Sequence, residues 1–339
     1  MADGERGERL TSVENELGRV KGSASMKRLS RLIKSIFVAG VLLTMISGPS
    51  MAAAKKPTVA FVMKTLTNPF FLMMKDGVLK AEKEFGCNVI IQAAEEETSI
   101  EQLVGIVESM IARKVDAICV TPSGSTEVIP VILKAERAGI PVIDVDVEID
   151  RNAAAAAGLK YYYVGANNFD GGYMAGKALA VALKGKGEVA ILEGIPGVDN
   201  AEKRKAGALK AFAEYPGIKV VASQTAHWKT EEALNVFTNM LQAHPRIAGV
   251  FCANDMMAFG VINAIEAAGK SGKILVTSYD ALDAAKVAIK SGAMLSSVDQ
   301  RPDLMGYYAV KFALERINGN EPPTPYMVPL TNVTKDTLK

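Results

Sequence analysis

Polar and aromatic side chains gather where the predicted strands of this chain end. Aromatic residues make up only 6% of the sequence, yet Phe70, Phe71, Trp228 and Tyr279 fall in or near these strand-end loops. Flat rings can cover the C–H faces of a ligand, while carboxylates, amides and an ammonium group satisfy hydroxyls that would otherwise be buried without partners. The combination is typical of non-covalent binding of a sugar or a polyol. The polar residues at these strand ends are Lys64, Thr121, Asp146, Ser223, Asn254, Asp280, Asp299 and Gln300.

Each of these residues also has a purely structural explanation. Asn254 or Asp280 could cap the helix that follows it, and Phe71 could belong to the hydrophobic core. The prediction of a ligand site therefore depends on the set of residues rather than on any one of them.

Residues for catalysis or metal binding do not form a recognisable pattern. The sequence contains two histidines, His227 and His244, without metal-ligand spacing, and it lacks a nucleophile elbow and a phosphate-binding loop. Gly194-Ile195-Pro196-Gly197 fits a dinucleotide fingerprint poorly and is interpreted as a binding loop. We therefore expect no catalytic residues, no metal and no cofactor.

The loop at residues 64–71 connects a buried strand to a helix. Residues 58–63 are almost wholly apolar, which is typical of a parallel strand covered on both faces. Pro69 suits the first turn of a helix, and Gly86 is expected to end that helix. Because ligands bind at the carboxyl ends of strands in open α/β sheets, Lys64 and Asn68 should lie at the site.

The same strand–helix alternation continues to the end of the chain. Apolar runs near residues 88–91, 117–120 and 141–145 alternate with helical patterns, and after an alanine run at 153–157 the alternation resumes from 161 to 298. Such alternation predicts right-handed crossovers and parallel sheets. The fold class is therefore α/β, and the length of 339 residues suggests about two domains.

The first 54 residues have the features of a secretory signal. Lys27, Arg28, Arg31 and Lys34 precede an apolar run from Ile36 to Ile46, and small residues follow up to Ala54. The run is too short to span a bilayer, which takes about 20 residues. We expect a signal peptide at 1–54, with Met26 as a possible true start, and a soluble periplasmic protein that is not a lipoprotein.

Composition excludes some partners. The formal net charge of +2 provides no basic surface for nucleic acid. The three cysteines, Cys87, Cys119 and Cys252, lie in or beside apolar runs and are expected to be small buried hydrophobes.

From about Thr58 onwards the chain resembles the periplasmic sugar-binding proteins of ABC transporters, specifically the ribose- and allose-binding group. The resemblance rests on residues 65–71, 222–224, 253–260 and 299–303. It implies two similar Rossmann-like lobes joined by a three-crossing hinge, with the ligand cleft between them. The implied lobes are residues 55–166 plus 301–328 and residues 167–300 plus 329–339, with crossings near Ala166, Gln300 and Val328.

The resemblance also implies which residues contact the ligand. Val147 and Glu202 stand where the ribose-binding pattern has arginines, so ribose is disfavoured and an allose-like sugar, a pentose or a polyol is favoured. The expected site has a formal charge of −2, because Lys64 contributes +1 and three carboxylates contribute −3, namely Asp146, Glu202 and Asp280. A ligand carboxylate would be repelled, whereas a neutral or cationic sugar is allowed. The implied contacts are Lys64, Asn68, Phe70, Phe71, Thr121, Asp146, Glu202, Trp228, Asn254, Asp280 and Gln300, and whether Asp199 and Asn200 join them is left open.

The sequence therefore predicts a monomeric, non-enzymatic receptor that captures a sugar by hinge closure and delivers it to a membrane permease. Two alternatives share this two-lobed core. One is a periplasmic receptor that serves a chemoreceptor or sensor kinase, which only the lobe surfaces could distinguish. The other is a lac-repressor-type regulator, disfavoured because a secretion signal occupies the place of its DNA-binding segment.

Overall fold

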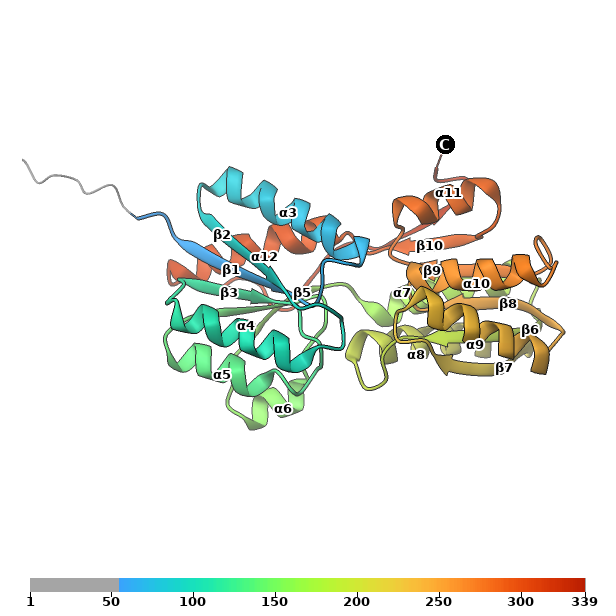
Figure 1. The fold of residues 1–339 in the computed structure, drawn as a ribbon, viewed down its shortest axis with the longest axis horizontal. Helices are drawn as coiled ribbons and strands as arrows, with labels where there is room; N and C mark the ends of the chain where they lie inside the picture. Colours follow the sequence, from blue (N-terminus) through green and yellow to red (C-terminus); the bar gives the residue numbers. More distant parts are fainter. Residues whose placement is uncertain (1–54, 339) are drawn as a thin grey trace, which may run out of the picture. The chain divides into compact units, whose positions relative to one another are not determined.

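The structure, a computed structural model, describes residues 55–338. The predicted signal peptide and the alternative start at Met26 lie outside the described residues. Two six-stranded sheets organise the described chain, with strand orders β11-β5-β4-β3-β1-β2 and β12-β10-β9-β8-β6-β7. All neighbouring strands are parallel except β10 and β12. The predicted fold class is confirmed: two α/β lobes, each built on one sheet (Figure 1).

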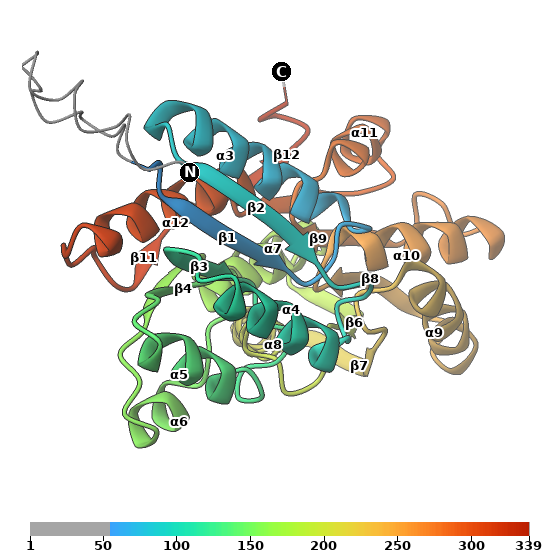
Figure 2. The same ribbon diagram turned by 60° about the vertical axis from the view of Figure 1, so that its left-hand side comes forward.

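The first lobe has helices on both faces of its sheet (Figure 2). Helices α3 and α12 pack side by side on one face, and α4 and α5 cover the other. Its strands are β1 (Thr58–Met63), β2 (Asn88–Ala93), β3 (Ala117–Val120), β4 (Val142–Val145), β5 (Tyr162–Gly165) and β11 (Tyr326–Met327). Its helices are α3 (Pro69–Phe85), α4 (Ile100–Ala112), α5 (Ile129–Arg137), α6 (Arg151–Ala156) and α12 (Pro302–Ile317).

The second lobe repeats this plan. Helices α7 and α8 pack together against one face of its sheet, and α9 and α10 pack together against the other. Its strands are β6 (Lys186–Glu193), β7 (Gly217–Thr225), β8 (Ile247–Cys252), β9 (Leu275–Tyr279), β10 (Ser296–Asp299) and β12 (Thr331–Thr334). Its helices are α7 (Asn168–Ala182), α8 (Asp199–Ala213), α9 (Thr230–Ala243), α10 (Asp255–Ala267) and α11 (Asp283–Ser291).

The chain passes between the two sheets at three places. It leaves the first sheet after β5 and enters the second lobe at α7, and it returns between β10 and α12. It passes again to the second sheet between β11 and β12. Each lobe therefore combines segments that are far apart in the sequence.

Alternate residues of the first sheet face different cores. Phe61 and Met63 of β1 belong to a cluster with α3 and α12, whereas Ala60 and Val62 pack with residues of α4 and α5. All four side chains are fully buried. This two-sided burial explains why the strand is apolar at every position, as expected for a parallel sheet between two helical layers.

Local signals position the helix that leads away from β1. Asn68 is the N-cap of α3, where its side chain accepts a hydrogen bond from the Phe70 N–H at 3.0 Å, and Pro69 occupies the first turn. Gly86 ends the helix with a φ of 65°, as predicted. The alanine run contributes to the short helix α6, which Asp150 caps by accepting from the Ala153 N–H.

The three cysteines are free and buried. Cys119 and Cys252 lie on β3 and β8, which hold the same place in the two strand orders. Burial raises the pKa of both thiols. The prediction that the cysteines are small core residues is confirmed.

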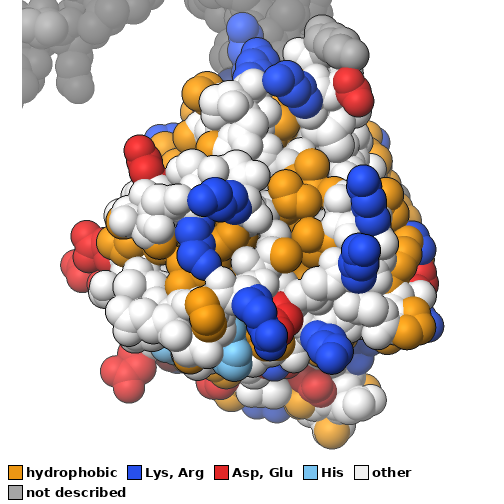
Figure 3. Space-filling model, turned by 90° about the vertical axis from the view of Figure 1, so that its right-hand side faces the viewer, with side chains coloured by type: hydrophobic (Ala, Val, Ile, Leu, Met, Phe, Trp, Pro, Cys, Tyr) orange, Lys and Arg blue, Asp and Glu red, His pale blue; other side chains and the backbone are white. Residues whose placement is uncertain are grey.

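The outer surfaces of the second lobe are mixed in character. Figure 3 shows one of its faces, where Lys and Arg side chains stand among hydrophobic and uncharged ones. A hollow between α9 and α10 is lined by Leu241, Pro245, Ala264 and Lys270, among others. Across residues 55–338, the structure contains no helix with the length and apolar character needed to cross a membrane.

Candidate ligand-binding site

A small cavity of about 20 Å³, counted as the space open to the centre of a water molecule, lies between the two lobes, at the carboxyl ends of their strands. Eleven of its twelve lining residues are less than 9% exposed, and the remaining one, Glu97, has a side chain that is 15% exposed. The first lobe contributes Lys64, Asn68, Phe70, Phe71, Glu97 and Asp146, and the second contributes Asn200, Arg204, Trp228, Asn254, Asp280 and Gln300. Both lobes therefore enclose the cavity in this conformation.

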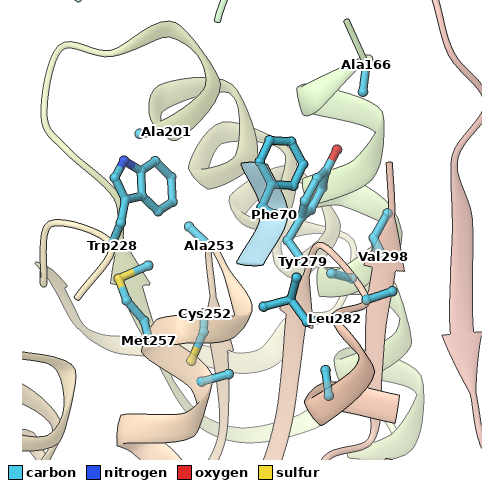
Figure 4. Close-up of a cluster of buried hydrophobic side chains, with 14 of the residues drawn as sticks. Phe70, Ala166, Ala201, Trp228, Cys252, Ala253, Met257, Tyr279, Leu282 and Val298 are labelled. Carbon is cyan, nitrogen blue, oxygen red and sulfur yellow. The ribbon is translucent and has the colours of Figure 1, made fainter. Parts of the chain in front are cut away.

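Aromatic rings from both lobes meet at this cavity. Figure 4 shows Phe70, from the first lobe, between Trp228 and Tyr279 of the second, and all three belong to one buried cluster. Phe70 and Phe71 stack edge to face, with ring centroids 5.1 Å apart. The indole of Trp228 lies over Gly194, where an added Cβ would come within 2.0 Å of the ring. Gly194 thus provides the space in which the only tryptophan packs.

Lys64 is buried between two carboxylates of its own lobe. Its Nζ lies 3.7 Å from Glu97 Oε2 and 4.0 Å from Asp146 Oδ2. Glu97 is held in place by the Asn68 side-chain amide, which donates to Glu97 Oε1 at 3.0 Å. Burial raises the pKa of Asp146, while Lys64 and Arg204 oppose that shift. The lysine is therefore neutralised within the site.

Arg204 is the cation of the second lobe. Its Nε donates to Asn168 Oδ1 at 2.8 Å, and its Nη1 donates to the Ala253 carbonyl at 3.0 Å. The guanidinium carbon lies 3.8 Å from the centroid of the Tyr279 ring, so the two groups stack. Its Nη1 also lies 3.8 Å from Asp280 Oδ1. Contacts within the protein therefore hold the charge, the plane and the donors of Arg204 in place.

Several of the lining residues have a backbone conformation that is unusual for a side chain other than glycine. The φ angles are 70° at Asp146, 66° at Trp228 and 108° at Asp280. Residues with positive φ are uncommon outside glycine and concentrate at functional sites. At Asp146 the conformation is held by Tyr163, whose hydroxyl donates to the Asp146 carbonyl at 2.8 Å.

Two asparagines combine a structural role with a place in the cavity. Asn68 caps α3, and Asn254 caps α10 by accepting from the Met257 N–H at 2.9 Å. Both also line the cavity. Asn254 therefore caps a helix, which was the structural explanation from the sequence, and it also lines the cavity.

Three buried polar atoms of lining residues have no hydrogen-bond partner in the described protein: Asp146 Oδ1, Asn200 Oδ1 and Trp228 Nε1. An unsatisfied buried polar group costs about 1–3 kcal/mol. Two acceptors and one donor at one cavity indicate a ligand that offers both hydroxyl donors and oxygen acceptors.

Two residues predicted for the site do not line the cavity. The Thr121 hydroxyl accepts a hydrogen bond from the Lys64 backbone N–H at 2.9 Å, which ties the ends of β1 and β3 together. Glu202 Oε1 accepts from the Gly197 N–H at 3.0 Å and so stabilises the loop before α8. The other nine predicted residues are brought together.

Three lining residues were not among the predicted contacts. Asn200, whose place in the site the sequence leaves open, lines the cavity and lies on α8 with Arg204. Glu97 lies in the loop after β2, within a run of three glutamates. The lining therefore contains two cations and three carboxylates, a formal charge of −1 instead of the expected −2. The lining is less negative than expected because Arg204 also lines the cavity, while Glu97 replaces Glu202 in the count.

Burial is the main cause of the raised pKa of two carboxyl groups in the second lobe, Asp280 and Asp255. It raises the pKa of Asp280 well above its ordinary value, and the nearby Asp255 raises it further while Arg204 lowers it. Burial also raises the pKa of Asp255 to about 7, although Ser297 donates to it at 2.7 Å. Within residues 55–338, no group of three or more His, Cys, Asp or Glu side chains could hold a metal ion.

Known proteins are similar to this chain in sequence. A D-ribose/D-allose-binding protein of Pseudomonas aeruginosa is 35% identical over 270 residues, which cover 79% of this chain and 84% of that protein. The D-allose-binding periplasmic protein of Escherichia coli is 35% identical over 273 residues, covering 80% of this chain and 87% of that protein.

A solved structure is more similar in sequence. It is an ABC transporter periplasmic solute binding protein from Actinobacillus succinogenes 130z with bound D-allose, 54% identical, with a TM-score of 0.81. The match covers 84% of this chain and 99% of that one. The model of the family described as periplasmic binding protein domain matches residues 59–321. The chain therefore belongs to the periplasmic binding protein family.

Proposed function

We propose that this protein is a periplasmic receptor that binds a neutral monosaccharide of the D-allose type and presents it to an ABC importer. One observation carries the proposal: a buried cavity between two lobes, lined by three aromatic rings and by fixed polar side chains, with unpartnered buried acceptors at Asp146 and Asn200. The 54% identity to a D-allose-bound solute binding protein supports this choice among sugars.

The charges of the cavity favour a neutral ligand. Each cation already has a carboxylate near it, Lys64 beside Glu97 and Asp146, and Arg204 beside Asp280. A sugar acid would add a negative charge to a buried site that already has one carboxylate more than it has cations. Such a like-charge contact without a free cation is strongly unfavourable in a desolvated site.

The proposed cycle needs only binding and closure. The ligand would bridge residues of both lobes and so favour the closed conformation, and reopening would release it to the permease. The role is non-enzymatic and the receptor acts as a monomer. Export would depend on the predicted signal peptide.

The test is a thermal-shift and calorimetric screen of the mature protein, starting at Lys55. A ligand at 100 times its Kd stabilises the folded state by about 2.7 kcal/mol. We expect D-allose to raise the melting temperature more than D-ribose, myo-inositol or D-glucuronate, and to be recovered unchanged after incubation. A melt that only sugar acids shift would contradict the proposal, as would chemical conversion of the sugar.

Trp228 provides an independent signal because it is the only tryptophan. D-Allose should change its fluorescence, and Trp228→Ala should remove both the signal and tight binding measured by calorimetry. Undiminished affinity in that variant would exclude a stacking role for the indole. Phe169→Ala is a matched control, since Phe169 is 39% exposed and outside the cavity lining.

A further inference from the structure

Helix α8 presents two different faces at the boundary between the lobes. Asn200 and Arg204 line the ligand cavity. Asp199 and Lys203, one position earlier in each case, contact the first lobe instead. The Asp199 backbone N–H donates to Ser125 Oγ at 3.1 Å. The helix that contributes cavity-lining residues therefore also forms a hydrogen bond and an ion pair with the opposite lobe.

Lys203 forms an ion pair across this boundary. Its Nζ lies 2.9 Å from Glu148 Oε2 of the first lobe and 2.9 Å from Asp199 Oδ1 of its own helix. The Glu148 side chain is only 4% exposed, whereas that of Lys203 is 42% exposed. The contact is therefore partly shielded from solvent, and its attraction is screened less than that of a surface pair.

The two carboxylate oxygens of Glu148 accept hydrogen bonds from different lobes. Oε1 accepts from Arg151 Nε at 2.6 Å and from the Tyr161 hydroxyl at 3.3 Å, both within the first lobe. Oε2 accepts from Lys203 of the second lobe. If the lobes separate, Glu148 keeps Arg151 and Lys203 keeps Asp199. Neither charge would be left buried and unpaired, so the contact can break and form again at low cost.

Lys229 repeats this arrangement on another side of the cavity. Its Nζ lies 3.0 Å from Glu96 Oε2 of the first lobe and 3.9 Å from Glu232 Oε1 of its own lobe. Here both partners are exposed, 46% for Lys229 and 58% for Glu96. Exposed pairs of this kind contribute little.

We propose that Lys203 and, more weakly, Lys229 are positioning residues that hold the lobes closed over the bound sugar and thereby set its rate of release. The proposal rests on the proposed function, because it assumes that a ligand occupies the cavity. Neither lysine lines that cavity. Both contacts form only when the lobes come together, so losing them should speed dissociation and leave the first encounter with the sugar unchanged.

The experiment compares wild type with Lys203→Gln, Lys229→Gln and Lys203→Arg by stopped-flow Trp228 fluorescence, with D-allose as the probe. We expect Lys203→Gln to raise koff about three- to tenfold, in line with a partly shielded ion pair. Lys229→Gln should raise it less than threefold, and Lys203→Arg should remain near wild type. In wild type, koff should rise with ionic strength, and this rise should be reduced in Lys203→Gln.

Lys205→Gln is the matched control. Lys205 is on the same helix and pairs with Glu193 at 2.9 Å, but both residues belong to the second lobe. Its substitution should leave koff within twofold of wild type. A koff of Lys203→Gln equal to that of wild type would overturn the proposal, and so would an equal increase in Lys205→Gln.

A second measurement does not depend on the identity of the sugar. Amide hydrogen exchange in ligand-free protein reports on the Asp199 N–H, which crosses the boundary to Ser125. The exchange should be faster in Lys203→Gln than in wild type or Lys205→Gln. If wild type binds none of the sugars tested, the proposed function fails, and this exchange rate alone decides whether Lys203 holds the lobes together.

Discussion

Asp146 and Asp280 occupy equivalent positions at the ends of β4 and β9, one in each lobe. Their backbone N–H groups donate to the next strand of their own sheet, from Asp146 to the Val164 carbonyl and from Asp280 to the Val298 carbonyl. Both have a positive φ, and both line the cavity. Each lobe therefore contributes a carboxyl group to the cavity from the same position in its sheet.

Asp280→Asn should weaken sugar binding without lowering the stability of the ligand-free protein. The carboxylate accepts from Gln300 Nε2 at 2.7 Å and faces Arg204, so its loss should weaken D-allose binding by about ten- to a hundredfold. Because burial makes its ionised form unfavourable, the melting temperature of ligand-free protein should not fall. Calorimetry and thermal melts check both outcomes. Asp283→Asn, at a side chain that is 95% exposed, should change neither, and a parallel loss of both in Asp280→Asn would contradict this assignment.

Gly194→Ala should displace the indole of Trp228. The new Cβ would meet three ring atoms at 2.0–2.5 Å, and these belong to a buried side chain that cannot yield without moving into the cavity. We expect a tenfold or greater loss of D-allose affinity, seen in titrations of Trp228 fluorescence. Gly105→Ala, where an added Cβ meets nothing within 4 Å, is the control. Equal affinities in the two variants would show that the position of the indole is unimportant.

Arg204→Lys should weaken binding although it keeps the charge. Lysine cannot reproduce the flat stack on Tyr279 or the separate hydrogen bonds to Asn168 and Ala253. We expect at least a tenfold increase in Kd and a lower melting temperature. The matched variant is Lys205→Arg, at a lysine whose partner Glu193 lies away from the cavity. Retention of wild-type affinity in Arg204→Lys would mean that only the charge matters.

Asp255→Asn should flatten the pH dependence of stability. Burial raises the pKa of Asp255 from 3.8 to about 7, so between these values the folded protein binds more protons than the unfolded chain. The contribution of this group to stability is present below pH 3.8 and is lost as the pH rises through 7. The melting temperature of wild type, relative to that of Asp255→Asn, should therefore fall from pH 4 to pH 7. A constant difference would show that Asp255 does not titrate in this range.

Much of the fold could be predicted because its signals are local. Apolar runs of four to six residues alternate with helical patterns, and Pro69 and Gly86 mark the two ends of α3. Nine residues that line the cavity could be named because strand ends meet at one edge of a parallel sheet and because the family resemblance implied the same positions. That geometry requires no knowledge of long-range packing.

The residues on α8 were harder to identify because a helix rotates by about 100° per residue. Asn200 and Arg204 are four positions apart and so share one face, whereas Glu202, midway between them, points to the other side. Glu97 was missed for another reason. It is one of three consecutive glutamates in a loop, and only the fold shows which of them lies beside Lys64.

Because the three native cysteines are buried, the rate at which the lobes open can be measured by alkylation of an introduced cysteine. A single cysteine introduced at Ser125, which is 8% exposed and contacts Asp199 of the opposite lobe, would be the one thiol that solvent reaches when the lobes part. Its alkylation rate would then measure how often the receptor opens, and the sugar should slow that reaction in proportion to the time the cleft stays shut.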